Sequence, residues 1–246
     1  MSNELLIEVS NLSKVYKYKN HRIKALDDVS IKIYNNEIVA FLGPNGAGKT
    51  TLIKIILNLV KKTRGEVNIF GSFNNKLHTS SIGYQPEIVS LKTSKKVKDI
   101  LMNVIEVSGF NSAEKNNELN RILSIIDIKC YLNRPANTLS KGMMTKVGLA
   151  ISLVGNPSTF IFDEPTEGLD PVGRRDTLDF LHRQKNEKKT VIISSHLLSE
   201  IEKVADRFFF FKNGQILGFG NMLDFMDGSD KKHTSLEDIY FSLINK

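Results

Sequence analysis

The sequence predicts an α/β fold built around a mainly parallel sheet. Strand-like runs at 159–165, 191–196 and 207–214 alternate with helical patterns around 172–186 and 197–205, and this alternation is typical of parallel sheets whose strands are joined by helices. The apolar run at 37–42 (EIVAFL) ends at a glycine-rich loop, which a helical stripe follows. A short, continuously apolar run of this kind indicates a strand buried on both faces of a sheet.

The rest of the chain predicts how this sheet is surrounded. Residues 5–9, 23–33 and 65–71 read as further strands, whereas residues 95–127 are polar with apolar positions at helical spacing. We therefore expect a single domain over 1–246. Its core would lie at about 1–90 and 153–225, with a helical subdomain at about 91–152 and a C-terminal helix at 234–246.

The composition excludes several classes of protein. The only cysteine among the 246 residues, Cys130, cannot form an internal disulfide, so we expect a reducing compartment and interpret Cys130 as a small core residue. No apolar run approaches the ~18 residues that a membrane-spanning helix needs, and the start MSNELLIEVS lacks the pattern of a secretory signal. The net charge of +7 permits an anionic partner without choosing among nucleotide, nucleic acid and membrane.

A phosphate-binding motif follows the first buried strand. GPNGAGKT at 43–50 matches G-x-x-x-x-G-K-[ST], in which Gly43, Gly46 and Gly48 let the backbone N–H groups converge on an anion. Lys49 adds a point charge for the β- and γ-phosphates, and Thr50 offers a hydroxyl ligand for Mg²⁺. The motif predicts that the chain binds a nucleoside triphosphate.

Three further patterns point to hydrolysis. FIFDEP at 160–165 is an apolar strand ending in Asp163, placed to hold Mg²⁺ through water, and Glu164, placed to accept a proton from the attacking water. In TLSKGMMTKVGLA at 138–150, Ser140 can cap a helix whose N–H groups face an anion. His196 ends the strand-like run VIISSH, at the sheet edge where ligands of open α/β sheets bind.

With these motifs in this order, the chain resembles the ATP-binding subunit of an ATP-binding cassette (ABC) transporter. GPNGAGKT corresponds to the Walker A loop, TFIFDEP to Walker B, LSKGM at 139–143 to the signature LSGGQ, and EGLD at 167–170 to the D-loop. The resemblance spans nearly the whole chain. It implies a P-loop NTPase core with a mainly parallel sheet, an antiparallel β subdomain and a helical subdomain.

The resemblance also assigns the site. It implies Glu164 and the switch histidine His196 as catalytic residues, and Thr50, Asp163 and Glu87 as metal ligands. The ATP contacts it implies are Tyr16, Gly43, Pro44, Asn45, Gly46, Ala47, Gly48, Lys49, Thr50, Thr51, Glu87, Ser140, Gly142 and Asp170. In the family, two subunits form a head-to-tail sandwich in which the signature of one contacts the γ-phosphate bound to the other.

Some positions depart from the family pattern or leave a choice open. Lys141 and Met143 replace a glycine and a glutamine of the signature. At the Q-loop, GYQPE places Glu87 after the proline where the family has Gln, with Gln85 as the alternative. For the aromatic residue that stacks on adenine, Tyr16 is preferred and Tyr18 is the alternative. The guanine-reading [NT]KxD element is absent, which counts against a GTPase.

The resemblance finally predicts the partners. We expect a separate transmembrane permease and a second cassette subunit, identical or different, at the cytoplasmic face of the membrane. LSKGM and the tail SLEDIYFSL at 235–243 resemble the bacterial type-two export group and favour export of an unknown substrate. The alternatives are a cassette acting on DNA or ribosomes through the basic stretches at 92–98 and 185–189, and a nucleotide kinase. Nucleic acid is not the expected partner, because no aromatic residues are interleaved with these stretches.

Overall fold

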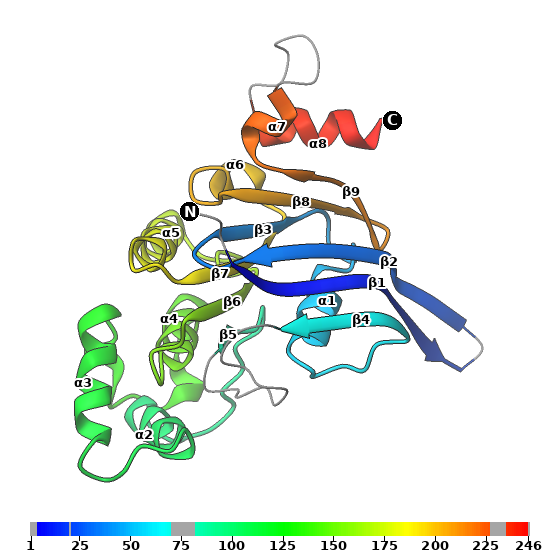
Figure 1. Cartoon of the computed structure of the whole chain (residues 1–246). Coiled ribbons are helices and arrows are strands. Elements are labelled where there is room, and N and C mark those ends of the chain that lie inside the picture. The colour runs from blue at the N-terminus through cyan, green and yellow to red at the C-terminus, as the bar shows by residue number, and fades with distance from the viewer. Residues whose placement is uncertain (1–3, 20, 70–81, 227–234, 246) are drawn as a thin grey trace. The chain divides into compact units, whose positions relative to one another are not determined.

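The computed structural model describes residues 4–19, 21–69, 82–226 and 235–245. The chain divides into two compact units, drawn in Figure 1. The first unit contains Met1–Lys76 and Leu181–Lys246, and the second contains Leu77–Phe180. The single domain expected from the sequence, with a helical subdomain at about 91–152, stays a prediction.

An antiparallel sheet occupies the N-terminal part of the first unit. It has the order β2-β1-β4, formed by β2 (His21–Tyr34), β1 (Leu5–Tyr18) and β4 (Arg64–Ile69). Leu12 and Leu26 are fully buried, because alternate side chains of these strands face the core. This sheet is the antiparallel β subdomain that the resemblance implied.

The first unit also carries the parallel strands that the sequence predicted. The strands β3 (Ile38–Leu42) and β7 (Thr190–Ser195) are paired in parallel, and β8 (Arg207–Lys212) joins β3 on its other side, also in parallel. At the edge, β9 (Gln215–Gly220) runs antiparallel to β8. Every residue of β3 and β7 is buried, as expected for strands covered on both faces.

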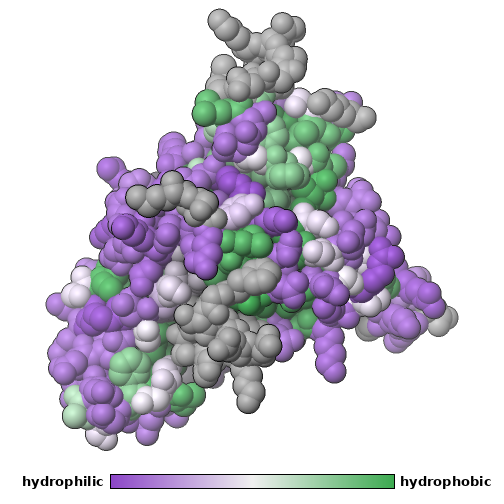
Figure 2. Space-filling model, viewed as in Figure 1, coloured by the Kyte–Doolittle hydropathy of each residue, from purple (hydrophilic) through white to green (hydrophobic). Residues whose placement is uncertain are grey.

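Four short helices and part of a fifth complete the described part of the first unit. They are α1 (Lys49–Ile56), α6 (Leu198–Ile201), α7 (Met222–Met226), α8 (Leu236–Ile244), and the end of α5 (Pro171–Asn186), which contains the boundary between the units. The tail helix predicted at 234–246 is therefore present, and Ser235 caps it by accepting a hydrogen bond from the Asp238 N–H at 3.2 Å. An apolar surface lies over β9, α7 and α8, with Phe219, Leu223 and Phe241 each at least 60% exposed (Figure 2).

In the second unit, two parallel strands pack against helices. The strands are β5 (Ile82–Gln85) and β6 (Thr159–Asp163), and α4 (Lys141–Ser152) packs against β5. The helix α2 (Val97–Val107) contacts α4, and α3 (Lys115–Ile125) contacts α2 (Figure 1). A Cβ built on Gly83 would lie 2.3 Å from the carbonyl oxygen of Ser152, so α4 lies directly on β5. The Phe160 and Phe162 rings stack 5.6 Å apart, and Phe180 from α5 meets them edge-on.

Candidate active site

The glycine-rich loop of the first unit joins β3 to α1. Its glycines adopt φ angles of 149° at Gly43, 80° at Gly46 and 108° at Gly48, which side chains rarely tolerate. A Cβ on Gly43 would lie 2.3 Å from the Phe211 carbonyl oxygen, and one on Gly48 would lie 2.6 Å from that of Ala25. Two of the three glycines are therefore required by neighbouring backbone as well as by their own conformation. Pro44, Asn45, Gly46 and Ala47 form the loop itself, and Thr50 and Thr51 lie in the first turn of α1.

Lys49 is folded back over this loop. Its Nζ donates hydrogen bonds to the carbonyl oxygens of Gly43 at 2.6 Å and Pro44 at 3.2 Å, and the residue is only 4% exposed. The ammonium group is thereby held beside the loop and the N-terminal end of α1. This concentrates positive charge where an anion would meet the backbone N–H groups.

The same edge of the first unit carries His196. Leu42 pairs with Ser195 across the parallel strands, and the Gly43 N–H donates to the Ser195 carbonyl oxygen at 3.3 Å. The half-buried His196 therefore follows its strand next to the point where the phosphate loop begins. The sequence placed both features at the carboxyl ends of strands, and the structure brings them together.

The predicted adenine-stacking residue lies on the antiparallel sheet of the first unit. Tyr16 is 37% exposed, and the Lys14 Nζ stands 4.7 Å from the centre of its ring. Tyr16 therefore lies at the surface, with a cation over its ring. The side chain of the alternative, Tyr18, lies outside the described part of the chain.

Of the two acids of the Walker B motif, Asp163 is the last residue of β6 in the second unit and Glu164 directly follows it. Asp163 is completely buried, and Glu164 is 6% exposed with a left-handed φ of 50°. This conformation is uncommon for a residue with a side chain and is found where a turn fixes it. Here the Glu164 carbonyl oxygen accepts a hydrogen bond from the Glu167 N–H at 3.1 Å, which closes the turn directly after the strand.

The structure separates the two Q-loop candidates. Gln85 packs toward α4, since its Cγ would lie 3.4 Å from a Cβ on Gly148, and it is only 2% exposed. Tyr84 faces the other way and shares its face with Asp163, because Tyr84 pairs with Ile161 and side chains alternate along strands. Glu87 begins the loop beyond this edge.

Tyr84 is a site residue that the sequence reasoning missed. Burial, together with the negative charges of Asp163 and Glu87, raises its pKa to about 12. The phenol therefore stays protonated and lies near both carboxylates, so Glu87 and Asp163 share one neighbourhood. The alternation of side chains along 82–85 was the signal that could have found it.

These oxygens suit a magnesium ion. Mg²⁺ is commonly held by one or two carboxylates and completed by water and phosphate oxygens. Asp163 and Glu87 provide carboxylates of this kind, and Thr50 provides a hydroxyl in the first unit. In the described ranges, no three His, Cys, Asp or Glu side chains gather into a metal site of their own. The Asp163 and Glu87 carboxylates of the second unit fit such an ion, because Mg²⁺ needs only one or two protein carboxylates.

The signature and the D-loop line one cleft of about 520 Å³ in the second unit. Ser140 caps α4 by accepting a hydrogen bond from the Met143 N–H at 3.3 Å, as predicted. Asp170 caps α5 in the same way, through the Gly173 N–H at 2.7 Å. Cys130 also lines this cleft and is exposed, so its interpretation as a core residue was wrong.

Lys141, the first departure in the signature, lies across the D-loop. A Cβ on Gly168 would stand 2.3 Å from the Lys141 Nζ, so the lysine occupies the space that this glycine leaves open. Gly168 has a left-handed φ of 67°. Next along the signature, Gly142 faces a side chain of the D-loop, with the Leu169 Cδ2 at 3.7 Å from a Cβ position.

Comparison with known proteins decides the family. The sequence profile of the ABC transporter family matches residues 26–167, more than half of the chain. The chain belongs to this family. An uncharacterised ABC transporter ATP-binding protein of Methanocaldococcus jannaschii is 35% identical over 89% of this chain and 78% of its own length. A lantibiotic transport ATP-binding protein of Streptococcus pyogenes is 34% identical over 86% and 89%.

Solved ABC structures agree with this assignment. The ATP-binding subunit of an ABC transporter aligns with a TM-score of 0.84 and 29% identity, covering 97% of this chain and 99% of its own. A further relative found by sequence, a bacitracin transport ATP-binding protein of Bacillus licheniformis, is 33% identical over 86% of this chain and 68% of its own length. The protein is therefore an ABC transporter ATP-binding subunit and an ATPase. None of its described helices has the length and apolar character needed to cross a bilayer.

Proposed function

We propose that this subunit hydrolyses ATP as a head-to-tail dimer and thereby drives export through a separate membrane permease. The observation that carries the proposal is the cleft shared by Ser140, Gly142 and Asp170. It combines the start of a helix with the D-loop in the second unit, whereas the phosphate loop belongs to the first unit. A surface of this kind suits a phosphate that is bound to another copy.

The chemistry within one copy follows from the residues described above. Lys49 and the loop N–H groups would hold the β- and γ-phosphates, and Tyr16 would stack on adenine. Bound Mg²⁺, held by Thr50, Asp163 and Glu87, would supply positive charge to the phosphate oxygens. Glu164 would accept a proton from the attacking water, and His196 would donate a hydrogen bond toward the γ-phosphate.

The second copy would complete the site. Ser140 and the N–H groups near Gly142 would contact the γ-phosphate of the partner's nucleotide, and Asp170 would link the two sites. Loss of the γ-phosphate removes these contacts, so the dimer opens after hydrolysis. Such a two-state element converts nucleotide state into movement of a permease.

The direction of transport rests on relatives and on two sequence features. Two relatives are named for the transport of bacitracin and of lantibiotics. The LSKGM signature and the SLEDIYFSL tail, which folds as α8, resemble those of the bacterial type-two export group and support the same direction of transport. We therefore propose export, with the substrate chosen by the permease.

Replacing Glu164 by Gln tests the mechanism. The variant should bind ATP and form a dimer on size-exclusion chromatography, while kcat falls by a factor of roughly 10³ because the general base is lost. Glu106→Gln, at an exposed glutamate of α2 in the same unit, is the matched control and should turn over normally. Hydrolysis by Glu164→Gln at the wild-type rate would remove Glu164 from this role.

Copurification tests the partner. A tagged copy isolated from its own cells with mild detergent should bring a multi-helix membrane protein with it. The export proposal fails if the chain returns only with ribosomes or DNA. Transport by vesicles that hold the recovered complex, measured in both directions, then separates export from import.

A further inference from the structure

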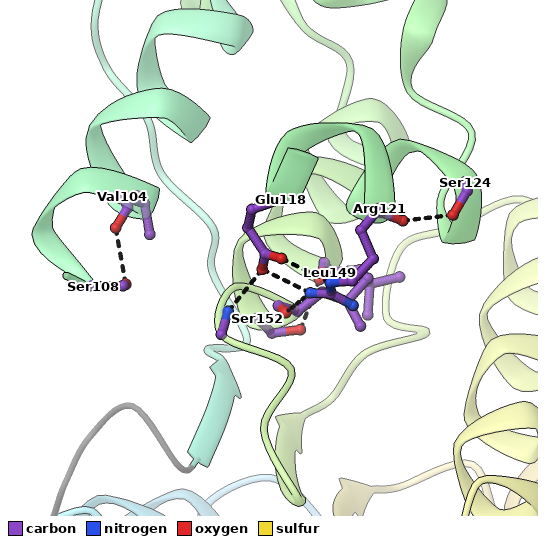
Figure 3. Close-up of polar contacts among 9 residues, drawn as sticks. Val104, Ser108, Glu118, Arg121, Ser124, Leu149 and Ser152 are labelled. Carbon is purple, nitrogen blue, oxygen red and sulfur yellow. Dashed lines mark hydrogen bonds and ion pairs between the residues drawn. The ribbon is translucent and has the colours of Figure 1, made fainter. Parts of the chain in front are cut away.

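A partly buried ion pair in the second unit ties α3 to the turn that follows α4 (Figure 3). The Arg121 guanidinium donates to both carboxylate oxygens of Glu118, each at 2.8 Å. The same guanidinium donates to the Leu153 carbonyl oxygen at 2.6 Å, and Glu118 accepts a hydrogen bond from the Gly155 N–H at 2.9 Å. Two side chains of one helix thus hold two backbone groups of the turn.

The two partners differ in exposure, since the Arg121 side chain is 30% exposed. Glu118 is only 7% exposed. Burial acts to raise its pKa, but the hydrogen bonds from Arg121 and Gly155 and the Arg121 charge outweigh burial and hold the pKa below its usual range. Bidentate Arg–carboxylate pairs also fix orientation, so the turn is held in one geometry.

This turn joins two of the elements that position site residues of the second unit. The helix before it, α4, begins at Ser140, and the strand after it, β6, ends at Asp163. The turn itself is tight, with left-handed φ angles of 79° at Gly155 and 49° at Asn156. The Leu153 carbonyl oxygen also accepts a hydrogen bond from the Asn156 N–H at 3.0 Å.

We infer that Glu118 and Arg121 are positioning residues for ATP hydrolysis. By fixing the turn, they set where the start of α4 stands relative to Glu164 at the end of β6. The inference rests on the roles proposed above for Ser140 and Glu164. It matters for rate because misplacing a reacting group by about 1 Å can cost ~10²-fold in turnover.

The alternative is that the pair only stabilises the fold, and a double variant separates the two. Glu118→Leu combined with Arg121→Met keeps apolar volume while removing the bonds to the turn, and such replacements of buried ion pairs often preserve stability. We expect a folded protein, shown by circular dichroism and thermal unfolding, whose kcat falls about tenfold. Its KM for ATP should stay within about twofold of wild type, because the P-loop lies in the other unit.

A matched control comes from the same helix. Lys115 on α3 pairs with Glu106 on α2 at 2.8 Å, and Glu106 is 63% exposed in its side chain. Glu106→Leu with Lys115→Met makes the same chemical change without touching the turn, so kcat should stay at the wild-type value. Arg121→Lys keeps the positive charge but loses the planar guanidinium that donates several hydrogen bonds at once. This variant should fold and give a kcat between those of the wild type and the double variant.

Two results would overturn the inference. One is a folded Glu118→Leu/Arg121→Met variant with kcat within about twofold of wild type. The other is an equal loss of kcat in the Glu106→Leu/Lys115→Met control. Failure of the underlying mechanism is recognised separately, since Glu164→Gln would then still hydrolyse ATP.

Discussion

The phosphate loop and the signature cleft both depend on glycine, but their glycines meet different neighbours. In the loop, Gly43 and Gly48 face backbone carbonyl oxygens of other strands, which cannot move aside. In the cleft, Gly168 faces the end of the Lys141 side chain, which can. The loop is therefore fixed by the fold, whereas the cleft can adapt to substitution. This difference matches the sequence, in which the Walker A motif is complete and the signature departs from LSGGQ.

The largest effect is expected in the phosphate loop, where neighbouring backbone cannot move aside. Gly43→Ala would place a Cβ 2.3 Å from the Phe211 carbonyl oxygen, so we expect a loss of roughly 4 kcal/mol in the free energy of unfolding and no ATP binding. Gly46→Ala meets nothing within 4 Å and should cost only about 1 kcal/mol, from its left-handed φ. Urea unfolding and binding of a fluorescent ATP analogue measure both. Equal losses of stability and of ATP binding in the two variants would show that the space around the added Cβ does not matter.

A smaller effect is expected in the cleft. Gly168→Ala would push the Lys141 ammonium aside and should lower kcat by about fivefold. Lys141→Gly restores the family pattern and should alone change kcat by less than about threefold. Because Lys141→Gly also removes the clash, the double variant should recover part of the activity that Gly168→Ala loses. A double variant no better than Gly168→Ala would mean that the backbone of the D-loop, rather than Lys141, limits the site.

Lowering the pH should affect the stability of the two units differently. Each unit has a Glu–Arg pair, and the pKa values of the two glutamates are shifted in opposite directions. The pKa of Glu118 is lowered, so its stabilisation is present above pH ~4.3 and is lost as the pH falls through its folded pKa. Burial raises the pKa of Glu37, despite the Arg207 pair at 2.9 Å, so its contribution is lost instead as the pH rises. Urea unfolding across acidic pH should show a shallower loss of stability in Glu118→Gln than in wild type. The Glu37→Gln variant should instead show an acid loss at least as steep as that of wild type, because the contribution it removes is present at low pH.

The smallest effect is expected at Tyr84. Since its pKa is about 12, the phenol stays protonated throughout an ordinary assay, and Tyr84→Phe should leave the pH–rate profile between pH ~6 and ~9 unchanged. The kcat value should fall no more than about threefold, through loss of a hydroxyl near Asp163 and Glu87. A profile that loses one of its limbs in Tyr84→Phe would instead make Tyr84 an acid or base.

Local sequence patterns predicted the elements whose chemistry is local. The buried strands β3, β6, β7 and β8 were predicted to within about three residues at each end, because continuous apolar runs end at glycines and acids. The P-loop was predicted because its glycines, its lysine and its threonine each have a local reason, namely backbone freedom, a positive charge and a hydroxyl ligand. The short strand β5 and the edge strand β9 were missed, since neither has a continuous apolar run and both depend on pairing with distant partners.

Site features that depend on tertiary contacts could not be predicted. Lys141 lies against Gly168, 27 residues further along the chain, and Glu118 accepts a hydrogen bond from the Gly155 N–H, 37 residues further along. No spacing rule encodes such contacts. Cys130 was misjudged for the same reason, because a cysteine in a polar stretch gives no sign of the cleft that it lines.

The left-handed backbone of Glu164 places this subunit in a trade-off between durability and activity. Glycine would adopt a φ of 50° without the penalty of about 1–2 kcal/mol that a side chain incurs. Selection for thermal resistance alone would therefore favour replacing the carboxylate on which turnover is proposed to depend. Laboratory evolution of a more thermostable subunit therefore needs a screen for ATP hydrolysis as well as for heat resistance. Without that screen, the selected variants will bind nucleotide but will not hydrolyse it.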